Sequence, residues 1–164
     1  MNIEKYTTKV QQALQEAQKL ALGMDHQSID PAHLMKGMLI VDNDVLSFLF
    51  GKMHFNDENF EAAIDKLIEG FPKTQGGQQY LSQDGLKVLA KSENLIKDFN
   101  DDYVSLEILL LAFVNEKNTV SQMLKDGGVT DKELRLAIKE LRKGNEVKSS
   151  SAEETYNSLE KYAR

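Results

Sequence analysis

The chain has 164 residues, of which 41% are hydrophobic, and it carries a net charge of -6 with no Cys. This length suffices for one well-buried core, or for two small units that share one, so we expect a single domain. The acidic balance disfavours nucleic-acid binding, and the lack of Cys excludes disulfides, thiolate metal sites and a Cys nucleophile.

The first half predicts four helices, each with one apolar face. Apolar residues recur at three- and four-residue intervals from Val10 to Ala21, which predicts a helix from Thr7 or Thr8 to Gly23. Asp30 followed by Pro31 is a strong helix start, because Asp can accept orphan amide bonds and Pro at the first position loses none. The remaining predicted helices are Pro31 to about Val41, Asn43 or Asp44 to Gly51, and Asn56 or Asp57 to about Ile68.

The second half repeats this order after a break. Residues 70–77 contain three Gly and one Pro and are predicted to link the halves rather than to form a helix. Thr130 and Glu133 form a capping-box pattern that marks the start of the last helix of this half. The predicted helices are Ser82 to about Phe99, Ser105 to about Asn115, Thr119 to Asp126, and Thr130 to about Arg142.

The two halves share an apolar pattern about 75 positions apart, in which Ile29 falls on Val104 and Leu34 on Leu109. We therefore predict an all-α fold, a pseudo-two-fold tandem repeat of two four-helix units. The domain is expected to cover 1–142, with repeat one at about 1–70 and repeat two at about 78–142. The polar stretch 143–151 is expected to be a flexible linker, and 152–164 to start a further helix that continues beyond the chain.

Catalytic and membrane signatures are not found. There is no Walker-type loop and no nucleophile elbow, and His26, His33 and His54 lie in separate segments without a metal-binding spacing. No apolar run approaches the roughly 20 residues that span a bilayer, and there is no signal-peptide core. We expect a monomeric, non-catalytic, cytoplasmic chain that binds no metal, nucleic acid or membrane.

Several segments together resemble the N-terminal domain of the bacterial Clp/Hsp100 AAA+ chaperones, most closely the ClpB disaggregase branch. These are residues 6–9, 29–35, 103–109 and 159–163, and the resemblance covers the entire chain. Ala32 stands where ClpC-type relatives carry Glu, which favours the ClpB branch. The last helix resembles the connector that leads into the first ATPase module.

The resemblance implies a mobile module that recruits exposed apolar segments of unfolded or aggregated polypeptides to a homohexameric ring, which cooperates with the DnaK system. No cofactor is implied in this chain, since ATP and magnesium belong to the ATPase modules of the parent. The substrate-binding residues that it implies are Thr7, Leu95, Asp101, Glu107 and Ile108, the two apolar ones lining a groove. An adaptor-docking or regulatory role, as in protease-associated ClpA and ClpC relatives, stays open as the alternative. An independent helical hydrolase would need a catalytic cluster that is not found.

Overall fold

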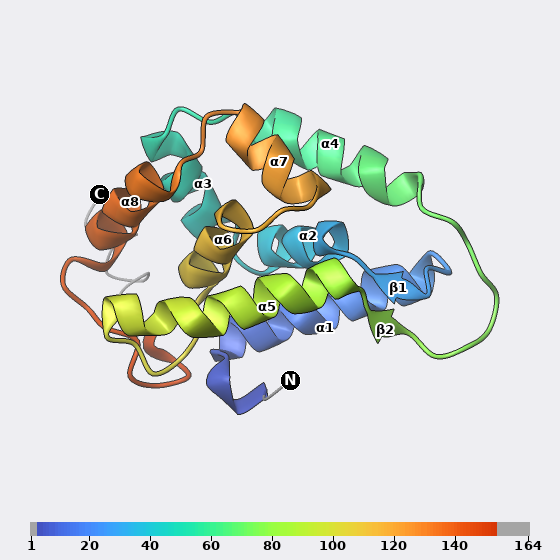
Figure 1. The fold of residues 1–164 in the computed structure, drawn as a ribbon, viewed down its shortest axis with the longest axis horizontal. Helices are drawn as coiled ribbons and strands as arrows, with labels where there is room; N and C mark the ends of the chain where they lie inside the picture. The colour runs from blue at the N-terminus through green and yellow to red at the C-terminus, as the bar shows by residue number, and fades with distance from the viewer. Residues whose placement is uncertain (1–2, 154–164) are drawn as a thin grey trace.

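The computed structural model describes residues 3–153 (Figure 1), which form mostly α-helix. Two short 3-10 helices, η1 (Ile3–Lys5) and η2 (Ile96–Phe99), and two two-residue strands, β1 (Ser28–Ile29) and β2 (Tyr80–Leu81), accompany the helices. The all-α prediction and the predicted helix order are confirmed, and the short strands are the elements that were not expected. The α-helices of this part of the chain are α1 (Thr8–Gly23), α2 (Pro31–Val41), α3 (Asn43–Lys52), α4 (Asp57–Glu69), α5 (Gln83–Leu95), α6 (Leu106–Val114), α7 (Thr119–Asp126) and α8 (Asp131–Arg142).

Each of these eight helices begins at a polar residue whose side chain accepts a hydrogen bond from a backbone amide of the first turn. Such caps satisfy amides that have no partner inside the helix, which is why the start positions could be predicted closely. The third helix is capped by Asp42, one residue before the predicted Asn43. In α2 the cap is reciprocal, because the His33 ring also accepts from the Asp30 amide. The capping residues are Thr7, Asp30, Asp42, Asn56, Ser82, Ser105, Asn118 and Thr130.

The two repeats match in backbone detail. Asp25 and Asn100 are 75 positions apart, and both adopt the left-handed conformation, with φ of 59° and 56°. In each repeat the next residue donates its amide to the carbonyl five positions earlier, at 2.8 Å from His26 and 2.9 Å from Asp101. His26 and Asp101 are therefore structurally equivalent positions.

The extended segments are exchanged between the repeats. Tyr6 of repeat one pairs with Val104 of repeat two in a parallel bridge, and Leu81 of repeat two pairs with Ile29 of repeat one in the β1–β2 sheet. The two pairings are equivalent, because Leu81 lies 75 residues after Tyr6 and Val104 lies 75 residues after Ile29. Each repeat thus completes its extended segment with the other, as two-fold symmetry requires.

The core lies around α2 and α6 at the centre of the molecule (Figure 1). α1 packs on α2 and α5 on α6, while α2 also contacts α5 and α6 contacts α1, so the repeats share one core. Every residue of α6 is buried. Gly37 permits the close α1–α2 approach, because a Cβ there would lie 2.3 Å from the Ala13 carbonyl oxygen. None of the helices within residues 3–153 has the length and apolarity to cross a bilayer.

Residues 144–153, here termed the C-terminal strap, pack against repeat two and the start of α1, which corrects the expectation of a flexible linker. Val147 is fully buried, and its carbonyl accepts from the Asp102 amide at 2.8 Å. Farther along, the Ser150 carbonyl accepts from the Thr8 amide at 2.9 Å. The buried Val147, the smaller contact of Ala152 with the core and a few backbone bonds therefore anchor a segment whose composition is typical of a linker. Of the helix predicted for 152–164, only Ala152 and Glu153 lie within the described residues.

Candidate functional site

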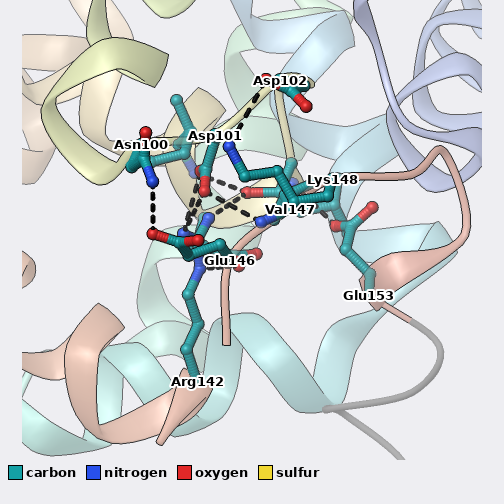
Figure 2. Close-up of polar contacts among 12 residues, drawn as sticks. Asn100, Asp101, Asp102, Arg142, Glu146, Val147, Lys148 and Glu153 are labelled. Carbon is teal, nitrogen blue, oxygen red and sulfur yellow. Dashed lines mark hydrogen bonds and ion pairs between the residues drawn. The ribbon is translucent and has the colours of Figure 1, made fainter. Parts of the chain in front are cut away.

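A buried cluster of charged side chains joins α6, α8, the loop before α6 and the C-terminal strap (Figure 2). Arg142, at the end of α8, is only 3% exposed. Its guanidinium donates to the Glu107 carboxylate at 2.9 Å, to Asp101 at 3.0 Å and to the Ser105 hydroxyl at 3.0 Å. Asp101 also accepts from the Val147 amide at 2.9 Å. We call these five residues the Arg142 cluster.

Glu153 brings a third carboxyl group to this region. It is 1% exposed and accepts from the Leu106 amide at 2.8 Å, in the first turn of α6. Burial, together with the nearby Glu107 carboxylate, raises the pKa of Glu153 to about 8. Burial also raises the pKa of Asp101, although Arg142 opposes this shift. Arg142 pairs with two of these carboxylates, Asp101 and Glu107, and Glu153 stays largely protonated at neutral pH, so it adds no third full negative charge.

The residues predicted to bind substrate lie in the interior. Thr7 caps α1, Leu95 ends α5, and Asp101, Glu107 and Ile108 surround the start of α6; all five are buried. The structure brings Thr7, Asp101 and Glu107 into one neighbourhood. The apolar groove expected at Leu95 and Ile108 is not open, because both side chains belong to the hydrophobic core. The open cavity beside the Arg142 cluster, of about 510 Å³, is lined instead by residues such as Phe99, Lys139 and Glu146.

The sequence reasoning missed Arg142, Val147 and Glu153 as parts of this neighbourhood. Arg142 lies 41 residues from Asp101 and 35 from Glu107, so spacing could not join them. Val147 is the only aliphatic residue of Val, Ile, Leu or Met type in the stretch 143–151, and this was the available sign that the stretch docks. Glu153 lies at the start of the further helix predicted for 152–164, whereas its carboxyl caps α6.

A second cluster occupies the equivalent place in repeat one, where His26 and His33 form a hydrogen-bonded pair. The His26 Nδ1 and His33 Nε2 atoms are 2.9 Å apart, and the Asp30 amide donates to His33 Nδ1 at 2.9 Å. Burial lowers the pKa of His33 to about 4 and also lowers that of His26. His33 thus lies in the first turn of α2 with its ring bonded to backbone, and the meeting of the two rings was not expected from their separate segments.

A cavity of about 210 Å³ lies beside this pair. The Phe71 ring packs edge-on to His26 with ring centroids 5.7 Å apart, and it lies 5.4 Å from His33. Within the described residues no group of three or more His, Asp or Glu side chains is placed to hold a metal ion. The lining residues are His26, Gln27, Ser28, Asp30, Phe71, Pro72, Thr74 and Tyr80.

The amino-acid sequence is similar to a known domain family and to several chaperone proteins. The Clp repeat (R) N-terminal domain family matches residues 5–127. The chaperone protein ClpB of Bacteroides thetaiotaomicron is 47% identical over 163 residues, and that of Porphyromonas gingivalis is 45% identical over the same length. Each alignment covers 99% of this chain but 19% of the relative, so the chain spans about a fifth of the length of these curated relatives.

Solved structures share the fold. The Hsp104 N-terminal domain from Candida albicans superposes with a TM-score of 0.77 at 20% identity, covering 91% of this chain and 99% of that domain. The N-terminal domain of the ClpV1 ATPase from E. coli gives a TM-score of 0.70 at 14% identity, covering 82% and 83% of the two chains. The chain therefore belongs to the Clp repeat N-terminal domain family, and its sequence is ClpB-like along nearly its whole length.

Proposed function

We propose that the chain is the substrate-recruiting module of an ATP-dependent, ClpB-like disaggregase, and that it binds exposed apolar segments of unfolded or aggregated polypeptides. The observation that carries this proposal is the 47% identity to a ClpB chaperone over 99% of the chain. In this proposal the chain has no catalytic role, and ATP and magnesium bind in ATPase modules outside it. The parent would act as a homohexamer together with the DnaK system.

The exposed surface suits weak and permissive binding. Large apolar side chains stand exposed on more than one element, among them Leu22 at 65% and Tyr80 at 56%. Burial of apolar surface is non-directional, so scattered apolar side chains can accept many different segments. After the costs of ordering a flexible polypeptide, we expect micromolar or weaker affinity, which allows the substrate to be handed on.

The test is a titration of the 164-residue chain with a fluorescently labelled, reduced and carboxymethylated protein that cannot fold. Saturable binding is expected, and the folded, disulfide-bonded form of the same protein serves as the control that should not bind. Binding of neither form would refute recruitment. Binding of a folded adaptor protein without binding of the unfolded chain would favour the adaptor-docking alternative.

A further inference from the structure

The tautomers of the histidine pair follow from a single backbone donor. Since the Asp30 amide donates to His33 Nδ1, the ring proton of neutral His33 must lie on Nε2. That proton is donated to His26 Nδ1, 2.9 Å away. The proton of neutral His26 is therefore on Nε2. Burial and the nearby Lys73 lower the pKa of His26, although Asp25 opposes this, so the ring is neutral at pH 7.

This leaves one buried donor without an acceptor. His26 is 3% exposed, and its Nε2 has no hydrogen-bond partner among residues 3–153. A buried polar group without a partner is disfavoured by roughly 1 to 3 kcal/mol, so such groups are rare in folded proteins. His26 also lines the cavity of about 210 Å³ next to Phe71, Pro72 and Tyr80. The site thus combines an unused donor with an apolar, partly aromatic wall.

The equivalent position in repeat two indicates what kind of group can bind beside His26. Asp101 is the equivalent of His26, and there the chain's own strap supplies the occupant: the Val147 amide donates to the Asp101 carboxylate, and the Val147 side chain is buried. An extended segment is therefore held by one backbone hydrogen bond to this position and one apolar side chain. With His at the equivalent position the polarity is reversed, because the side chain donates instead of accepting. The matching group on an extended segment is a backbone carbonyl.

We propose that the cavity beside His26 binds an extended polypeptide segment, with a backbone carbonyl accepting the His26 Nε2 proton and an adjacent apolar side chain packing between Phe71 and Tyr80. This inference rests on the proposed function and gives it a site. The cavity is large enough, since an engineered apolar cavity of about 150 Å³ admits benzene. Tyr80 is 56% exposed. Leu22 is 65% exposed and lines an adjoining cavity that His26 also lines. Both side chains can therefore extend the apolar contact with the bound segment.

The surrounding charges favour a neutral acceptor over an anion or a metal ion. Asp30 lines the cavity, so a free carboxylate or phosphate there would meet like charge, while Lys73 and Asp25 near His26 oppose one another. The proton on His26 Nε2 blocks the lone pair that a metal would need. A peptide carbonyl carries no charge and meets neither obstacle.

The test uses Tyr80→Lys, with Leu136→Lys as the matched control, because the two side chains are 56% and 54% exposed and lie on different elements. Both variants and the unchanged chain are titrated with a capped peptide in which Leu, Phe and Val are flanked by Gly and Ser. We expect Tyr80→Lys to weaken binding about tenfold or more, as loss of a central aromatic anchor does, and Leu136→Lys to change it less than about twofold. In ¹⁵N-labelled chain the His26 Nε2 resonance should shift on peptide addition, while that of His33 shifts less.

Equal affinity of the two variants, or an unmoved His26 Nε2 resonance at saturation, would overturn the site while leaving polypeptide recruitment intact. Absence of binding by the unchanged chain to both this peptide and the unfolded protein would overturn the proposed function and the site together.

A third variant, His26→Leu, keeps the cavity apolar and removes the donor. Its expected effect is a loss of about three- to tenfold in affinity, the usual range for one hydrogen bond. Urea unfolding of the three variants checks that each remains folded.

Discussion

Replacing Glu153 by Gln should remove a pH dependence that the C-terminal strap imposes on the fold. The Gln side chain has the shape of the protonated carboxyl group and keeps an oxygen to accept from the Leu106 amide. The pKa of Glu153 rises from 4.5 to about 8 on folding, so its stabilising effect is complete below pH 4.5 and is lost as the pH rises to about 8. At about 1.4 kcal/mol per pH unit, the loss between pH 5 and pH 8 is up to about 3.5 kcal/mol.

The strap can detach while the eight helices stay folded, so the loss in global stability cannot exceed the free energy with which the strap docks. Two assays separate global unfolding from detachment of the strap. Urea unfolding at pH 5 and pH 8 reports global stability, and hydrogen exchange at the Val147 amide, which donates to Asp101, reports docking of the strap. Faster exchange, corrected for the intrinsic rate, is expected at pH 8 in the unchanged chain than in Glu153→Gln. Glu146→Gln, at an exposed hydrogen bond to Asn100, is the control.

The reasoning is refuted if Glu153→Gln and the unchanged chain lose stability and Val147 protection in parallel from pH 5 to pH 8. Other groups titrate in this interval, but they are common to both proteins, and the difference between them isolates Glu153. A buried carboxylate that stayed ionised at neutral pH would produce that parallel behaviour.

Five further substitutions test the packing, each by urea unfolding. Gly37→Ala should destabilise by about 3 kcal/mol, because its Cβ would meet the Ala13 carbonyl oxygen, whereas Gly51→Ala, with open space around it, should be neutral or stabilising by up to about 1 kcal/mol. Arg142→Met should cost about 3 to 5 kcal/mol, since it leaves Asp101 and Glu107 buried without their cation; a loss below about 1 kcal/mol would contradict the assigned ion pairs. Leu89→Ala should cost about 2 to 5 kcal/mol and the half-buried Leu14→Ala less than half as much, and equal costs would reject the observed helix faces.

The helices could be predicted from the sequence because their determinants are local. Asp30 and Pro31 define the start of α2 within two adjacent residues, and the predicted Pro31 to Val41 range agrees with the structure. The symmetry was also readable, since apolar spacing survives where residue identity does not. The two short strands could not be read, because two-residue extended segments carry no periodic signal.

The candidate site was harder to predict, because burial of polar groups depends on partners that are distant in the chain. Glu107 in isolation looks like a solvated residue of a helix start, and only the arrival of Arg142 makes it an interior group. Likewise, His26 and His33 are separated by β1 and the start of α2, and the path of this segment brings the rings together. Position-by-position transfer of functional residues from the family selected side chains that lie near one another, but the structure places them in the interior and not on a surface groove.

Because Tyr6 pairs with Val104 and Ile29 with Leu81, each half of the chain depends on the other for its extended segments. A half-chain expressed alone would leave its leading extended segment and its acceptor loop without partners, and a second copy of the same half would satisfy both. Two such half-chains are therefore expected to associate as a homodimer. In the single polypeptide the halves need not be identical, and one carries a histidine pair where the other carries an arginine surrounded by acids.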